Sequence, residues 1–306
     1  MTLHIPSLLA AGLSLSMAGI PATAQQGKTY GDGSRGEVFL PLGDLSFADR
    51  VVSHTPGTGK IKDSAARAEP ALGAPDFSGD VDDGTFLSLG CDGSLVLEFT
   101  DNALVELEGP DLYVFEVGPK VEGLTLAISA DGVDWTDVGA ITGGTAEVDI
   151  APVATADTDY RFARITDDGL GCGTSFAGAD IDAVAAIGSA MRFTLDASVL
   201  FAVDSDMLRP AALSSLDTLA HDIAAAGISK FTVIGHTDAS GSAAYNMDLS
   251  LRRAKAVRSY LADRPALSKV SIKAVGRGES QPVADNDTDA GRQMNRRVEI
   301  IAQSGS

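Results

Sequence analysis

Short runs in which apolar and polar residues alternate fill residues 25–190. The runs with the length and alternation of strands are residues 94–100, 112–117, 124–129, 146–150, 160–166 and 183–187. Turn sequences such as Asp92-Gly93, Asp131-Gly132 and Gly143-Gly144 separate them, and no window shows the period of a helix. Several short strands at this spacing predict an all-β sandwich.

A different pattern, in which strands and helices alternate, occupies residues 191–306. Pro210 at its start and Gly227 past its end bracket a predicted helix with an apolar stripe along one side. A longer helix is predicted over residues 243–262, before Pro265, and strands over residues 191–201, 231–234, 270–275 and 297–301. This alternation predicts an α/β two-layer domain.

An uncharged apolar segment precedes both regions. Residues 1–24 contain no Lys, Arg, Asp or Glu, and they end on the small-x-small sequence Ala22-Thr23-Ala24. This pattern predicts a signal peptide cleaved after Ala24, hence an exported protein with one domain at residues 25–190 and another at 191–306. An N-terminal membrane anchor is the alternative interpretation.

The formal net charge of −19 is distributed unevenly. Residues 191–306 carry 14 basic and 13 acidic side chains of the chain's 23 and 42, which leaves 9 basic and 29 acidic ones for residues 1–190. The asymmetry supports a division into two domains. The overall charge excludes a chain-wide nucleic-acid interface, because phosphate binding needs a cationic surface.

The acidic region holds both cysteines, Cys91 and Cys172. In an oxidising compartment two cysteines of one domain usually pair, so we predict a disulfide between them. Two separate buried thiols are the alternative.

Aspartates cluster in the same region, and their carboxylates are candidate ligands of Ca²⁺, which takes six to eight oxygens. The candidates are Asp80, Asp82, Asp83, Asp180 and Asp182. The alternative is a set of solvated acidic loops that keep an exported protein soluble.

The sequence Ser129-Ala130-Asp131-Gly132-Val133-Asp134-Trp135 resembles the S-x-D-G-x-x-W hairpin of discoidin-like (galactose-binding-like) jelly rolls. Residues 160–165 are similar to a late strand of the same families. The resemblance implies an eight-stranded, jelly-roll-like sandwich of a kind often used to bind glycans or surfaces. The alternative is that Asp131-Gly132 is only a turn and Trp135 only a core residue.

A set of five motifs spans residues 191–306. They are Phe201-x-x-Asp204-Ser205 with Leu208-x-Pro210, Gly235-His236-Thr237-Asp238, Tyr245-Asn246-x-x-Leu249-Ser250-x-x-Arg253-Ala254, Gly276-Arg277-Gly278-Glu279-x-x-Pro282, and Asn286-x-Thr288-x-x-Gly291-Arg292-x-x-Asn295-Arg296-Arg297-Val298-Glu299. In order and spacing they resemble the OmpA-like peptidoglycan-binding domain. Val203 and Asp206 depart from the usual aromatic and acidic residues near the opening motif.

The resemblance implies noncovalent binding of the peptidoglycan stem peptide through meso-diaminopimelate. The family's Asp and Arg for this contact fall on Asp238 and Arg253, which suit an ammonium beside a carboxylate. The other predicted contacts are Thr237, Asn246, Arg292 and Arg296 with neighbouring Arg297, and free N–H groups of the 237–239 loop. Alternatively, Asp238 caps a helix and Arg253 forms a surface ion pair.

No nucleophile elbow, zinc-protease motif or phosphate loop occurs in the sequence. Together with the resemblance to the OmpA-like domain, this predicts a non-enzymatic protein of the periplasm that is associated with peptidoglycan at the outer membrane. It needs no cofactor and binds peptidoglycan rather than nucleic acid. It presents an acidic β-sandwich of unknown ligand. The alternative is an outer-membrane or surface protein whose N-terminal domain binds or acts on a glycan, with residues 191–306 as its anchor.

Overall fold

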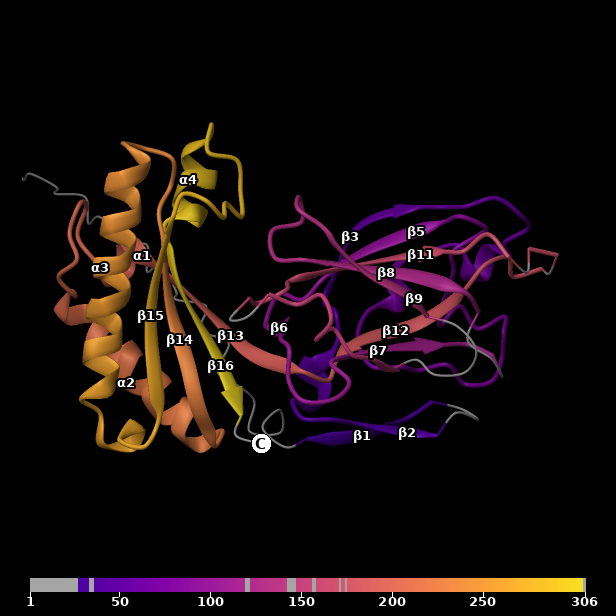
Figure 1. Ribbon diagram of the computed structural model, residues 1–306, viewed down its shortest axis with the longest axis horizontal. Coiled ribbons are helices and arrows are strands. Elements are labelled where there is room, and N and C mark those ends of the chain that lie inside the picture. The colour runs from indigo at the N-terminus through magenta and orange to yellow at the C-terminus, as the bar shows by residue number, and fades with distance from the viewer. Residues whose placement is uncertain are drawn as a thin grey trace, which may run out of the picture.

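The computed structural model describes residues 27–32, 36–118, 122–141, 147–155, 158–170, 172–173 and 175–304. The predicted signal peptide and the turn Gly143-Gly144 lie outside the described residues. Figure 1 shows a sheet-rich part and a part with helices against a sheet, joined by the long strand β13. No helix in the described residues is long and apolar enough to cross a membrane.

The strands of the sheet-rich part are β1 (Lys28–Gly31), β2 (Glu37–Leu40), β3 (Arg50–Thr55), β4 (Leu87–Ser88), β5 (Ser94–Glu98), β6 (Asn102–Leu104), β7 (Leu112–Glu116), β8 (Leu124–Ser129), β9 (Thr136–Ile141), β10 (Glu147–Val148), β11 (Phe162–Asp167) and β12 (Asp180–Ala186). Short 3₁₀ turns lie at Gly43–Ser46, Asp63–Ala65 and Glu69–Ala71. The described residues before Ala197 contain no α-helix, which agrees with the predicted all-β composition.

Two antiparallel sheets carry most of this part, with strand orders β10-β7-β12-β4 and β3-β5-β11-β8-β9. Because side chains alternate along a strand, each sheet can direct one set inward. Leu95, Ile128 and Ile165 of one sheet and Val114 and Val184 of the other belong to one buried apolar cluster. Packing of both sheets into one core is the arrangement that the alternation of short strands predicts.

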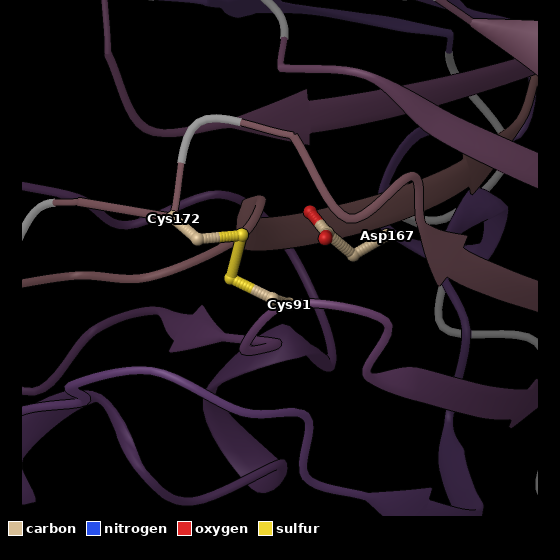
Figure 2. Close-up of side chains that lie close together, drawn as sticks. All are labelled: Cys91, Asp167 and Cys172. Atoms are coloured by element: carbon tan, nitrogen blue, oxygen red, sulfur yellow. A yellow bond between two sulfur atoms is a disulfide. The ribbon is translucent and has the colours of Figure 1, made fainter.

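The predicted disulfide is present: Cys91 and Cys172 are bonded, with their Cα atoms 5.9 Å apart. Figure 2 shows the carboxylate of Asp167 beside the two sulfur atoms. That carboxylate accepts hydrogen bonds from the backbone N–H groups of Asp92, Gly169 and Ala179. The bridge and the carboxylate together hold the loop after β11 against the loop before β5.

Removing this bridge is expected to destabilise the protein substantially. Its ends are 81 residues apart, and closing a loop of that size in the unfolded chain is worth about 4 kcal/mol in the entropy model. Cys91→Ser with Cys172→Ser should therefore lower the free energy of unfolding by roughly 2–4 kcal/mol, measured by denaturant titration. Mass analysis should find both thiols of the wild type unreactive to alkylation until reduced. Ready labelling of the native, unreduced protein would reject the bridge.

Burial raises the pKa of four carboxyl groups in the sheet-rich part. Burial raises the pKa of Asp180 to about 7. It raises the pKa of Asp101, Asp111 and Asp182 to about 6.

Mild acidification is therefore expected to stabilise the protein. Between about pH 4 and 7 the folded state keeps protons that an unfolded Asp, with a pKa of about 3.9, has released, so stability falls as pH rises through this range. The Tm near pH 5 should exceed that near pH 8 by roughly several degrees. Asp180→Asn should raise the Tm at the higher pH and shrink the difference. A Tm that climbs from pH 5 to pH 8 would contradict this assignment.

The C-terminal part is a two-layer α/β domain. Its elements are β13 (Ser189–Asp196), α1 (Ala197–Leu200), α2 (Pro210–Ala225), β14 (Ile228–His236), α3 (Ala243–Ala262), a 3₁₀ turn (Pro265–Leu267), β15 (Ser271–Gly278), α4 (Asp289–Asn295) and β16 (Arg297–Ser304). The sheet order is β15-β14-β16-β13-β6, with β14 and β15 parallel and the other pairs antiparallel. Helices α2 and α3 cover one face (Figure 1).

The first strand of this sheet differs from the prediction over residues 191–201. It begins at Ser189 and ends at Asp196, whose carboxylate accepts the N–H of Ser198 and so caps α1. The N-terminal part also supplies an edge strand, because β6 pairs with Ser189–Met191 of β13. The two parts thus share backbone hydrogen bonds in one sheet.

Candidate functional site

The candidate site lies where β14 ends and α3 begins. Gly235 and Gly276 let helix α3 approach the sheet closely. A Cβ on Gly235 would lie 2.1 Å from the Ser250 carbonyl oxygen, and a Cβ on Gly276 would lie 2.7 Å from the Leu251 nitrogen. Ser242 caps α3, with its hydroxyl accepting the N–H of Tyr245 at 3.3 Å. Asp238 is therefore not the helix cap, and its carboxylate is left for other partners.

Asp238 is 7% exposed and lies in the loop between β14 and α3. Its carboxylate forms an ion pair with Arg296 and accepts the N–H of Ser240 at 2.9 Å. Burial acts to raise the pKa of Asp238, but the hydrogen bonds from Arg296 and Ser240 outweigh it and hold that pKa below its usual value. The group is an anion at neutral pH.

Arg253 is 5% exposed on α3. Its Nε donates to the Ser205 carbonyl at 2.9 Å, and its guanidinium lies 5.3 Å from the centre of the Phe201 ring. Burial lowers the pKa of Arg253, although nearby Tyr245 and Asp204 act in the other direction. Within the described part of the chain no carboxylate forms an ion pair with it, so the surface ion pair is not what this arginine makes.

Asn246 connects helix α3, which carries Arg253, to the loop that carries Asp238. It lies on α3 seven positions before Arg253, two turns earlier on the same side of the helix. Its amide donates to the Asp238 carbonyl at 3.2 Å and to the carboxylate of Glu279. The 2% exposure of Asn246 shows that this contact is internal, so it positions the Asp238 loop.

The remaining predicted contacts surround this centre unequally. Arg296 reaches Asp238, whereas Arg292 donates to the Asn286 carbonyl at 2.5 Å and pairs with Asp289. Arg297 pairs with Glu299 in a different buried cluster. Thr237 is buried, and its hydroxyl has no hydrogen-bond partner among the described residues.

The expectation of free N–H groups in the 237–239 loop is wrong for two residues. The Thr237 N–H donates to the Gly278 carbonyl at 2.9 Å, and the Ala239 N–H donates to Asn286 at 3.1 Å. Both donors serve to hold the loop in place, since β15 and the loop before α4 lie against it.

Several contributors had no predicted role although they lie in or beside the motifs. Phe201 supports Arg253, and Glu279 holds Asn246. Gln293 accepts from Arg296 and donates to both oxygens of Asp196. Motif membership was the available signal for Phe201 and Glu279, but the contacts themselves depend on the tertiary fold.

The calcium candidates do not converge in the described residues. Asp82 pairs with Lys62 at 2.7 Å, and Asp83 accepts from Ser78 and Thr85. Asp80 accepts the N–H of Asp82. Asp180 accepts from Ser88, while Asp182 accepts from the backbone of residues 76 and 77. Among the described residues, one set of side chains has its potential metal-ligand atoms close together: Cys91, Asp167 and Cys172. The two sulfurs of this set are bonded to each other.

Residues 200–296 match the family described as the OmpA family. The chain is 37% identical over 155 residues to the outer membrane porin F of Pseudomonas aeruginosa, covering 50% of this chain and 44% of that protein. It is 37% identical over 113 residues to the peptidoglycan-binding protein ArfA of Mycobacterium tuberculosis, covering 37% of this chain and 34% of that protein. A protein of Escherichia coli named as the lipoprotein YfiB is 34% identical over 107 residues, covering 35% of this chain and 67% of that protein.

A solved structure, that of the cell wall anchor of the T6SS from Pseudomonas aeruginosa, is 29% identical with a TM-score of 0.33, covering 38% of this chain and 82% of that chain. Through residues 200–296 this chain belongs to the OmpA family. The matched region spans less than half the length of porin F and of ArfA. The resemblance of residues 129–135 to discoidin-like jelly rolls stays a prediction.

Proposed function

We propose that the protein is a non-enzymatic component of the cell envelope that binds peptidoglycan noncovalently through the diaminopimelate of the stem peptide. The observation that carries the proposal is Arg253, a buried cation with no acidic partner among the described residues. It lies on helix α3, whose Asn246 holds the loop that carries the anion Asp238. Family membership and the peptidoglycan-binding relative ArfA support it.

The geometry suits the end of the diaminopimelate side chain. Arg253 is fixed through Nε, so its two terminal nitrogens remain for a carboxylate, which a guanidinium can hold with two parallel hydrogen bonds. The ligand's ammonium would join the Asp238 carboxylate, whose other partner, Arg296, is half-exposed. Asn246 and Thr237 would form the wall of the site, and Arg292 would stabilise its outer loop.

We further propose that residues 25–190 form an exported domain that residues 191–306 tether to the cell wall. Its assignment to a discoidin-like jelly roll rests on the hairpin around Asp131, which turns between β8 and β9 with Gly132 at a φ of +79°. Trp135 immediately precedes β9, and the guanidinium of Arg164 lies 4.5 Å from the centre of its ring. A glycan or another surface ligand for this domain is the associated hypothesis.

The proposal is tested by cosedimentation of the full mature chain with purified diaminopimelate-containing sacculi. The protein should pellet with the sacculi and remain bound at moderate salt, because the pairing charges lie in a buried site. Protein that stays in the supernatant at every sacculus concentration would overturn the assignment.

A further inference from the structure

A cavity lined by charged residues lies where the two parts of the molecule meet. In Figure 1 the sheet-rich part faces the side of the C-terminal sheet opposite α2 and α3. The volume of the cavity is about 30 Å³, and a neighbouring hollow of about 100 Å³ shares Asp159, Ile234 and Arg277 with it. Alternation along the strands accounts for the position. Phe231 and Val233 of β14 pack in the core, whereas Ile234 lines the cavity.

Four guanidinium groups line this cavity in a protein that is otherwise strongly acidic. Arg192, Arg277 and Arg297 come from the C-terminal sheet, and Arg161 comes from the segment before β11. Residues on both parts therefore bring positive charge to one junction. Like charges so placed repel one another unless anions lie between them.

The carboxylates present are already shared. Glu299 pairs with both Arg192 and Arg297, and Glu98 pairs with both Arg161 and Arg50. Two further acids line the cavity, Asp131 and Asp159. The Asp131 carboxylate accepts the N–H groups of residues 133 and 134 within its own turn.

Two guanidinium donors in the cavity lining lack partners. The Nε atoms of Arg161 and Arg277 are buried and have no hydrogen bond among the described residues. Burial and the nearby charge of Arg192 lower the pKa of Arg161 to about 10, yet the group remains charged at neutral pH. A buried charged donor without an acceptor is costly, so an acceptor in this cavity would stabilise the fold.

We propose that this cavity binds an oxyanion, a carboxylate or phosphate group, between Arg161 of one part and Arg277 of the other. The small cavity lies among the four guanidinium groups, and the adjoining hollow, which Lys230 and Lys273 also line, offers space for a larger molecule that carries the oxyanion. Binding would tie the two parts together, because the ligand contacts both. The site is separate from Asp238 and Arg253 and does not depend on the proposed peptidoglycan contact.

The test is a thermal unfolding series on the full mature chain with inorganic phosphate or acetate, at an ionic strength held constant with sodium chloride. A site predicts a saturable rise in Tm of roughly 5–10 °C at a hundredfold excess over Kd. Arg161→Gln and Arg277→Gln should each abolish most of the rise, whereas Arg67→Gln, at an exposed position, should leave it intact.

Glucose 6-phosphate and glucuronate, which carry the same groups on a sugar, separate the two sources of the oxyanion. Saturation at lower concentration with the sugar-borne group would assign the site to a larger ligand, and equal saturation would assign it to the free ion. No anion-specific shift in the wild type, or equal shifts in the wild type and both variants, would overturn the proposal.

Discussion

Asp238→Asn and Arg253→Gln are each expected to weaken binding to sacculi by about 30-fold to 4,000-fold. Each variant leaves one charge of the ligand unpaired in a buried site, which typically costs roughly 2–5 kcal/mol, and about 1.4 kcal/mol corresponds to a factor of ten in affinity. Arg253→Lys should weaken binding to sacculi almost as much, because an ammonium cannot form the two parallel hydrogen bonds that the planar guanidinium makes with a carboxylate. The measurement is a cosedimentation isotherm over a range of sacculus concentrations.

The control for these variants is Lys255→Ala, which removes an exposed cation from the same helix. Lys255→Ala should bind as the wild type does, while all variants keep a wild-type circular dichroism spectrum. Unchanged binding by a folded Asp238→Asn, Arg253→Gln double variant would show that sacculi are held elsewhere on the protein.

Glu299→Gln is expected to lower the free energy of unfolding by about 3–5 kcal/mol, since it leaves two buried cations uncompensated. Arg192 and Arg297 both pair with this carboxylate, and the side chains of the three residues are only 4–6% exposed. Arg192 and Arg297 hold the pKa of Glu299 below its usual value against the opposing effect of burial. Urea titration of the purified variant measures the loss.

Arg192, Arg297 and Glu299 should tolerate joint replacement by apolar residues, although replacing Glu299 alone is strongly destabilising. Replacing Arg192 and Arg297 by Met together with Glu299→Leu should recover most of the stability, because the cost lies in the unpaired charges. The exposed pair of Arg252 and Asp248 on α3 provides the matched control, and Asp248→Asn should change stability by less than about 1 kcal/mol. A Glu299→Gln loss no larger than that of Asp248→Asn would contradict the role assigned to the cluster.

The sequence predicted helices and strands best where neighbouring residues mark their ends. Pro210 and Gly227 bracket α2, and the helix predicted over residues 243–262 is α3, because Ser242 caps its start and its apolar side faces the sheet. Strand β8 also lies where its alternation placed it. In each case the signal came from neighbouring residues along the chain.

Elements that depend on distant partners escaped prediction. β6 has three residues, Asn102–Leu104, and is a strand because β13 pairs with it from almost 90 positions away. α4 spans seven residues, and Thr288 caps its start with a hydroxyl that accepts the N–H of Gly291. A run this short carries too little periodicity to be recognised.

In the candidate site, too, the sequence predicted the residues in the motifs but not their tertiary partners. Asp238 and Arg253 were found from motif spacing. The two simpler interpretations of them do not hold, because Ser242 caps α3 in place of Asp238 and because Arg253 is buried and donates to the Ser205 carbonyl. Arg296 is the C-cap residue of α4 and pairs with Asp238, whereas Arg297 begins β16 and pairs with Glu299, two positions further along the same face of the strand. The motif spacing does not specify these partners.

Competition with soluble stem peptides tests the central claim most directly. The full mature chain, bound to sacculi, should be released by a peptide containing meso-diaminopimelate but not by the same peptide with lysine, which keeps the ammonium and lacks the adjoining carboxylate. Such a difference would place the ligand's carboxylate on Arg253, and it should disappear in Arg253→Gln. Equal release by the two peptides, or release by neither, would contradict recognition of diaminopimelate.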